Sequence, residues 1–344
     1  MAPKLPPWLI ALSGVGTIGG AYVLLKGQDP PYDTKERIAG KTVIVTGANT
    51  GLGKETAMNL ASRGGKIIMG CRDMEKCMIA RDDIIEKTYN KNVHCKKLDL
   101  ASFKSIREFA AAVNKEEEHL EVLVNNAGVM EPPKSYTEEG IELQMGVNYF
   151  GPFLLTHLLL DLLKESAPSR VVNVVGFPTA TARINFKDLN SSSKYSPSAV
   201  YFQSKLALLM FSKKLGEKLA GSGVSTYAVY PGLASHTELD RHLQMNKWKI
   251  SKVMMAPIQY TTMIPKEHAV QDIVYCAVEP SIADQTGQYW HQRKTLEPRP
   301  ILDSHANRLW AVSEHWTDIK TDLTNMNMKS EPKIDVKTED KVAQ

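Results

Sequence analysis

The sequence lacks the features that mark several large classes of protein. Its net charge is only +4 and no long run of basic residues occurs, which argues against nucleic acid as a partner. No segment of roughly 20 to 50 residues repeats, which argues against a repeat architecture. The chain has few cysteines, and their spacing matches neither metal nor redox motifs. We therefore expect no metal site and free, mostly buried thiols at Cys71, Cys77, Cys95 and Cys276.

The N-terminal segment departs from this ordinary composition. Residues 8–25 contain no charged side chain, and a helix of about 20 apolar residues spans a bilayer, so we predict a membrane anchor and linker in residues 1–37. A cleaved signal peptide is the alternative, but the apolar stretch is long and no clear A-x-A-like cleavage site follows it. More basic residues follow the segment than precede it. In a cytoplasm-facing membrane, that bias would keep the rest of the chain on the cytoplasmic side.

Beyond a proline-rich linker, short apolar strands alternate with helical segments. The strand-like runs include TVIV, KIIMGC, LEVLVNNAG, RVVNVVG and STYAVYPG, and helical patterns such as EKCMIARDDIIEKTYN separate them. This alternation predicts βαβ units and a doubly wound α/β fold with a parallel sheet covered on both faces. We predict a single domain over residues 38–300 and a C-terminal extension, residues 301–344, that is disordered at its polar end.

A glycine-rich turn, TGANTGLG at residues 46–53, follows the first predicted strand and opens the first predicted helix. Gly47, Gly51 and Gly53 allow a pyrophosphate to approach the backbone closely. The helix N-terminus beyond them offers free N–H groups and a partial positive charge. Because the turn lies between a strand and a helix, it predicts a dinucleotide cofactor rather than a simple tight turn.

The residue after the second predicted strand bears on the choice between NAD and NADP. An acid at this point binds the ribose 2′-hydroxyl, whereas an arginine accommodates a 2′-phosphate. Here the strand runs into Arg72, whose planar guanidinium suits a phosphate, with Asp73 one position further on. We therefore predict NADP(H) as the cofactor, with a solvated surface role for Arg72 as the alternative.

Several motifs together resemble the short-chain dehydrogenase/reductase family. They are TGANTGLG, NNAG at residues 125–128, Asn148, Tyr201-x-x-x-Lys205 and Pro231-Gly232, and they span residues 40 to about 295. More narrowly, GKTVIVTGANTGLGK, CRDMEKC, LDLASFKSIREFAA and NNAGVM are similar to the retinol dehydrogenase 11 to 14 branch. The resemblance implies a seven-stranded, Rossmann-type parallel sheet in the order 3-2-1-4-5-6-7. It also implies NADPH-linked reduction of lipophilic carbonyls such as retinaldehyde.

The same resemblance assigns residues to the cofactor site. It implies that Asp99 contacts the adenine ring. It also implies that the glycine-rich loop and the later strand ends line the cofactor, through Gly47, Asn49, Thr50, Gly51, Leu52, Gly53, Asn126, Ala127, Gly128, Pro231 and Gly232.

Tyr201 and Lys205 are four residues apart in a helical pattern, which puts both side chains on one helical face. Because an ammonium stabilises a phenolate, we expect Lys205 to lower the pKa of Tyr201 from its usual value of about 10. Tyr201 then gives a proton to a carbonyl oxygen as hydride arrives, or takes one from an alcohol. The resemblance implies that Lys205 also holds the nicotinamide ribose and that Asn148 holds a water linking Lys205 to solvent.

One position departs from the family pattern. The family carries a serine about 25 residues before the tyrosine, at the end of the fifth strand, and its hydroxyl donates a hydrogen bond to the substrate carbonyl. Here that substrate-contacting position is Gly176. Losing one positioned donor costs roughly 10²- to 10³-fold in rate. A water, a backbone N–H of Gly176 or Phe177, or the hydroxyl of Thr179 or Thr181 could replace it; alternatively nothing does, and the chain is nearly inert.

Two functions therefore stay open. The first is a reversible NADPH-dependent reductase of lipophilic carbonyls, weakened by Gly176, and the second is a non-catalytic NADP(H)-binding scaffold of the same fold. The methionine-rich residues 242–263 could form a lid over a lipid-like substrate, a second membrane-contacting surface or ordinary packing. Similarity to one member of the branch favours the mitochondrial inner membrane, with the endoplasmic reticulum membrane as the alternative. A homo-oligomer is left open.

Overall fold

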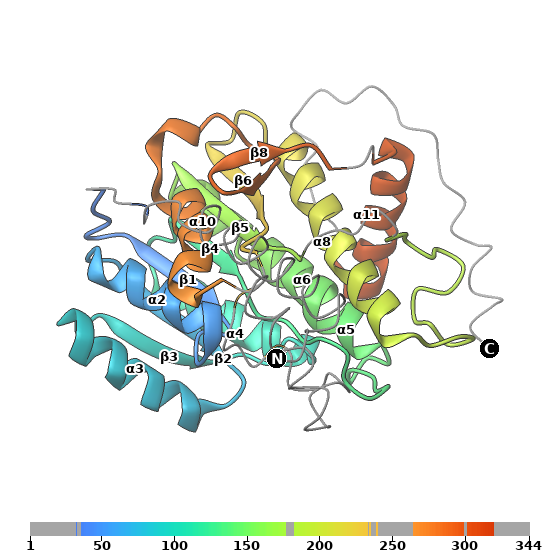
Figure 1. Ribbon diagram of the computed structural model, residues 1–344, viewed down its shortest axis with the longest axis horizontal. Coiled ribbons are helices and arrows are strands. Elements are labelled where there is room, and N and C mark those ends of the chain that lie inside the picture. The colour runs from blue at the N-terminus through green and yellow to red at the C-terminus, as the bar shows by residue number, and fades with distance from the viewer. Residues whose placement is uncertain are drawn as a thin grey trace, which may run out of the picture.

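The computed structural model describes residues 32, 36–176, 182–232, 234, 239, 264–298 and 301–319. They form an α/β domain around an eight-stranded sheet in the order β3-β2-β1-β4-β5-β6-β7-β8, with helices on both faces (Figure 1). The strands are β1 (Thr42–Thr46), β2 (Lys66–Cys71), β3 (Val93–Lys97), β4 (Val122–Asn125), β5 (Ser169–Val174), β6 (Val224–Val229), β7 (Gln288–His291) and β8 (Lys294–Leu296).

The helical elements connect these strands. They are α2 (Gly51–Ser62), α3 (Met74–Thr88), α4 (Phe103–Glu116), α5 (Leu143–Met145), the π-helix η1 (Gly146–Phe150), α6 (Gly151–Leu158), α7 (Leu160–Glu165), α8 (Pro197–Lys218), α10 (Lys266–Val278), the 3₁₀-helix η4 (Pro280–Ile282) and α11 (Asp303–Thr317).

The sheet separates two hydrophobic cores. One contains buried side chains of α4, α6, α8 and α11, and the other contains those of α2, α3 and α10. Alternate residues of β1 point to opposite cores, Ile44 to the first and Val45 to the second. A parallel strand covered on both faces is apolar throughout, which explains why β1 reads as the unbroken run TVIVT. The predicted doubly wound, single-domain α/β fold is confirmed.

The sheet has one strand more than predicted. The seven parallel strands lie in the expected order, and β8 adds to the edge by pairing antiparallel with β7. The two strands are joined by Gln292 and Arg293, both with positive φ, as a tight hairpin turn requires. Their N–H groups donate to the carboxylate of Asp272 at 2.8 and 3.0 Å. This side chain from α10 stabilises a hairpin whose sequence, HQRK, carries no glycine or asparagine turn signal.

Helix α11 falls within the predicted C-terminal extension and packs against the domain beside α8 (Figure 1). The Ser313 and Tyr149 hydroxyls are 2.7 Å apart in a buried hydrogen bond. The ring of Trp316 stacks on Phe150 with 4.9 Å between centroids. Helix α11 therefore covers η1, the π-helix that contains both Tyr149 and Phe150.

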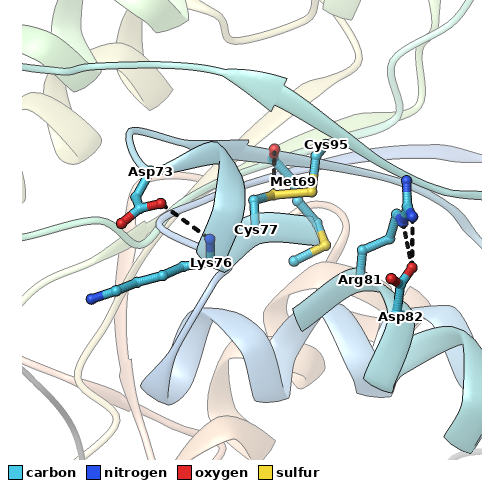
Figure 2. Close-up of a disulfide and its surroundings, with 7 residues drawn as sticks. All are labelled: Met69, Asp73, Lys76, Cys77, Arg81, Asp82 and Cys95. Atoms are coloured by element: carbon cyan, nitrogen blue, oxygen red, sulfur yellow. Dashed lines mark hydrogen bonds and ion pairs between the residues drawn. A yellow bond between two sulfur atoms is a disulfide. The ribbon is translucent and has the colours of Figure 1, made fainter. Parts of the chain in front are cut away.

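The prediction of four free thiols is wrong for two of them. A disulfide joins Cys77 in α3 to Cys95 in β3, with 6.1 Å between their Cα atoms (Figure 2). The two cysteines are 18 residues apart, and only the packing of α3 on the sheet brings them together. Cys71 and Cys276 are free and buried, as expected.

Several predictions concern residues outside the described ranges. They are the membrane segment 8–25, the candidate donors Phe177, Thr179 and Thr181, the methionine-rich residues 242–263 and the polar chain end. Within the described part of the chain, no helix is long and apolar enough to cross a membrane.

Candidate active site

A cavity of about 500 Å³ opens where the parallel strands end. In a doubly wound sheet, ligands bind outside these carboxyl ends. Of the predicted catalytic residues its wall lacks only Asn148, and it contains every residue predicted for cofactor or substrate: Gly47, Asn49, Thr50, Gly51, Leu52, Gly53, Arg72, Asp99, Asn126, Ala127, Gly128, Gly176, Tyr201, Lys205, Pro231 and Gly232.

The glycine-rich loop brings the start of α2 close to the end of β1. Gly47 has a φ of +65°, a conformation that L side chains rarely adopt. At Gly53 a Cβ atom would clash with the Gly47 carbonyl oxygen and would lie 2.5 Å from Asn126 Nδ2. Thr50, at the N-cap of α2, makes no side-chain capping bond. The first residues of the helix, Gly51, Leu52 and Gly53, line the cavity without a side-chain cap, so an anion there could bind their N–H groups.

Thr46 joins this loop to the next strand and was missed as a site residue. Its buried hydroxyl accepts hydrogen bonds from the N–H groups of Asn126 and Ala127, both at 3.0 Å. The Asn126 Nδ2 group donates to the Thr46 carbonyl oxygen at 2.9 Å. These bonds hold the ends of β1 and β4 together at the cavity wall. The only sequence signal was its place as the first residue of the glycine-rich motif.

Two cations lie where β2 runs into α3. Arg72 and Lys76 are exposed and line the cavity, and Lys76 was missed by the sequence argument. Asp73 caps α3, because its Oδ1 atom accepts from the Lys76 N–H at 3.1 Å (Figure 2). The Asp73 carboxylate is thus engaged with the helix N-terminus. This end of the cavity keeps two positive side chains for an anionic group.

The buried side chains of Tyr201 and Lys205 face the cavity from α8. The Lys205 ammonium donates to the Val174 carbonyl oxygen at 2.9 Å, at the end of β5. A Cβ atom placed on Gly128 would lie 3.4 Å from Lys205 Nζ and 3.3 Å from Asn148 Oδ1. Gly128 therefore leaves the space through which Asn148 and Lys205 face each other.

Asn148 belongs to the π-helix η1, behind the cavity wall. Its amide nitrogen donates to Val129 O and Ser204 Oγ, both at 2.9 Å, and its Oδ1 accepts from the Val129 N–H at 2.8 Å. Single π-turns inside helices are frequent at functional sites. The fully buried Asn148 side chain is held between the β4 loop and α8.

Burial controls the proton affinity of both catalytic candidates. It raises the pKa of Tyr201 to about 12, with smaller contributions from Tyr230 and Glu131. It lowers the pKa of the Lys205 ammonium to about 8. The expected lowering of the Tyr201 pKa is therefore not found, because removing the phenolate from water is the largest effect and Lys205 is not among the groups that shift this pKa. At neutral pH Tyr201 carries its proton.

Gly176 lies beside the Tyr201 hydroxyl, where the family pattern requires a serine. A Cβ atom at Gly176 would be 3.4 Å from Tyr201 Oη and 3.5 Å from Lys205 Cγ, which are ordinary van der Waals distances. A serine would thus fit and would place its hydroxyl next to the phenol. Counting residues back from Tyr201 in the sequence identified position 176 correctly as the position beside the phenol, and glycine provides no side-chain hydroxyl there.

Comparison with known proteins decides the family. The sequence pattern of the short chain dehydrogenase family matches residues 41–248. The chain belongs to the short-chain dehydrogenase/reductase family. Retinol dehydrogenase 13 of Homo sapiens is 49% identical over 314 residues, which cover 89% of this chain and 94% of that protein. The predicted resemblance to the retinol dehydrogenases is confirmed.

Solved structures of the family share the fold. The crystal structure of an uncharacterised protein from Mycobacterium Paratuberculosis is 33% identical, has a TM-score of 0.64, and covers 83% of this chain and 96% of its own. The RhlG/NADP active-site complex of Pseudomonas aeruginosa is 25% identical, with a TM-score of 0.57 and coverage of 74% and 94%. This short-chain dehydrogenase/reductase fold binds NAD(P), and the predicted oxidoreductase class is confirmed.

Proposed function

We propose that the protein is a reversible, NADPH-dependent reductase of lipophilic carbonyls. The observation that carries the proposal is the arrangement of three side chains: Tyr201 and Lys205 lie beside Gly176 in the cavity wall, and Asn148 approaches Lys205 across Gly128. A cofactor-binding scaffold has no need for a buried phenol and ammonium beside its nicotinamide end. Burying such groups is costly unless they are used or well paired.

The cofactor site favours NADP(H) over NAD(H). The glycine-rich loop and the start of α2 would hold the pyrophosphate, and Arg72 with Lys76 would hold the 2′-phosphate. The negative charge of Asp73 repels a phosphate only weakly, because its carboxylate interacts with the N-terminus of α3. When bound, the reduced nicotinamide supplies a hydride to the carbonyl carbon.

The chain itself supplies the proton. Tyr201 is protonated at neutral pH, so it can donate to the carbonyl oxygen as negative charge develops there. Lys205 would stabilise the phenolate that remains, and its bond to the Val174 carbonyl oxygen fixes the ammonium at the end of β5, in the same cavity wall as Tyr201. Asn148 lies next to Lys205 across Gly128. There it would hold water that links Lys205 to solvent, so that a proton can return to Tyr201 after each turnover.

The substrate is a long apolar aldehyde or ketone of the retinaldehyde type. Human retinol dehydrogenase 13 is one of the similar proteins, and the cavity wall includes the apolar side chains of Met130, Val175, Phe202 and Leu239. Apolar walls with a few polar groups are typical of sites for such molecules.

Residues 8–25 are proposed to anchor the enzyme to a membrane in which such substrates dissolve, with the mitochondrial inner membrane favoured. A variant lacking residues 1–30 is expected in the soluble fraction. Retention of that variant in the membrane fraction would show that other residues hold the protein there.

The reductase proposal is tested by NADPH oxidation with all-trans-retinal. We expect slow turnover that Tyr201→Phe abolishes while NADPH binding, measured by fluorescence titration, is retained. Tyr89→Phe makes the same chemical change at an exposed tyrosine and should leave turnover unchanged. Equal turnover of Tyr201→Phe and the unmodified chain would refute the mechanism. NADPH binding without turnover in any of these proteins would favour the scaffold.

A further inference from the structure

The cavity wall contains a second tyrosine, Tyr230. Among the described residues that line it, hydroxyl groups belong to Thr46, Thr50, Tyr201 and Tyr230. Thr46 bonds to the N–H groups of the β4 loop, and Thr50 lies at the phosphate end, on the N-cap of α2. Apart from the proton donor Tyr201, Tyr230 is therefore the remaining described residue of the cavity wall that carries a hydroxyl group.

The sheet places Tyr230 opposite Val175, the residue before Gly176. Strands β5 and β6 are parallel neighbours, with Val174 opposite Val229, and the Val175 N–H donates to the Val229 carbonyl oxygen at 2.9 Å. One step further along both chains brings Tyr230 to the end of β5, at the spacing of adjacent strands, about 4.8 Å.

The side chain of Tyr230 is on the same face of the sheet as Tyr201. Residues alternate along β6, so Ala228 packs in the core beneath α8, Val229 in the opposite core, and Tyr230 against the α8 core again. Helix α8 carries Tyr201. The interaction of the two phenols is also electrostatic, because Tyr230 contributes to the raised pKa of Tyr201.

Strand β7 holds Tyr230 in place. The Tyr230 N–H donates to Trp290 O at 2.9 Å, and its carbonyl oxygen is 2.9 Å from His291 Nδ1. The His291 ring packs on the Tyr230 ring, with 4.7 Å between centroids. Asp272 lies 3.6 Å from His291 Nδ1 and also binds the turn after β7. A ring supported in this way loses little freedom when it binds a ligand.

We propose that the Tyr230 hydroxyl donates a hydrogen bond to the substrate carbonyl oxygen, in the role that a serine at position 176 would have. This inference rests on the proposed reductase function. The hydride goes from NADPH to the carbonyl carbon and the proton goes from Tyr201 to the oxygen, whereas Tyr230 keeps its proton throughout. Burial raises the pKa of Tyr230, so the phenol is a neutral donor at physiological pH, as a serine would be.

A double-mutant cycle of Gly176→Ser and Tyr230→Phe tests this assignment, with kcat for retinal reduction and NADPH affinity measured in all four proteins. We expect Tyr230→Phe to lower kcat roughly 10²-fold when residue 176 is glycine, the effect of one lost oxyanion donor. When residue 176 is serine, the same change should cost less than about 5-fold, because the two hydroxyls substitute for each other. NADPH affinity should stay the same within about 2-fold in every protein, since neither change touches the phosphate end.

Tyr289→Phe is the matched control. Tyr289 is a buried tyrosine on the adjacent strand β7 in the same core, but it does not line the cavity. A kcat loss that is equal in the two backgrounds, or equal to that of Tyr289→Phe, would overturn the role of Tyr230. The reductase function would still stand in that case, provided that Tyr201→Phe abolishes turnover. If Tyr201→Phe has no effect, the proposed function itself fails.

Discussion

The imidazole of His157 should make the fold sensitive to mild acid. Its ring lies in an aromatic cluster, with centroid distances of 4.2 Å to Phe153 and 5.2 Å to Trp310. Nδ1 is 2.7 Å from the Phe153 carbonyl oxygen, whereas Nε2 is buried without a hydrogen-bond partner among the described residues. Protonation would place a charge at this apolar site. Burial accordingly lowers the pKa of His157 from 6.5 to about 4.

The sign and size of the effect follow from proton linkage. Below about pH 6.5 the unfolded chain binds a proton at His157, whereas the folded protein binds it only near pH 4, so acid favours unfolding across this window. Between pH 7 and pH 5, this residue should reduce the free energy of unfolding by about 2 kcal/mol. The loss should approach a limit of roughly 3 kcal/mol below pH 4.

Urea unfolding of His157→Phe and of the unmodified protein at pH 7 and pH 5 measures this contribution. Carboxylates also titrate in acid, but their contribution to the change in the free energy of unfolding is the same in both proteins and cancels in the comparison. The phenylalanine variant should lose about 2 kcal/mol less stability than the unmodified protein over that interval. His119→Phe, at an exposed histidine, should behave like the unmodified protein. Equal losses for His157→Phe and the unmodified protein would refute the reasoning.

Three further predictions concern the cofactor site and its surroundings. Gly53→Ala should weaken NADPH binding at least 10-fold in a fluorescence titration, because its Cβ would clash with the Gly47 carbonyl oxygen and with Asn126 Nδ2. Unchanged affinity would show that the loop can relax. Arg72→Ala should raise the NADPH dissociation constant roughly 10- to 100-fold, since a charge-assisted bond contributes about 1.5–3 kcal/mol. Lys76→Ala should raise it less, and NADH binding should change little in either variant. Equal weakening of both cofactors would contradict a 2′-phosphate site. Reduction of the disulfide whose cysteines are 18 residues apart should lower the free energy of unfolding by about 3 kcal/mol, measured in urea with and without dithiothreitol; identical curves would mean that the bridge does not constrain the unfolded chain.

Local sequence patterns were sufficient to predict the sheet and the cofactor loop. The β-branched runs, the glycines at 47, 51 and 53 and the spacing of Tyr201 and Lys205 each act over a few residues, where backbone geometry dictates the outcome. The missing serine was also visible in the sequence. A fixed strand–helix order places position 176 opposite the tyrosine, as the structure has it.

Other features depend on contacts between residues far apart in the chain. The Cys77–Cys95 bridge needs α3 to lie on the sheet, and the β7–β8 turn needs a carboxylate from α10. No local spacing encodes either contact. The position of Tyr230 at the reacting end likewise follows from the pairing of β5 with β6.

The sequence by itself determined the family, the doubly wound sheet and most of the residues named for the cofactor site, because these follow from short-range patterns. Only the tertiary structure decided the proton affinities of Tyr201 and Lys205 and brought Tyr230 to the site that lacks a serine. The physical reason is that desolvation and cross-strand proximity depend on what surrounds a side chain in three dimensions.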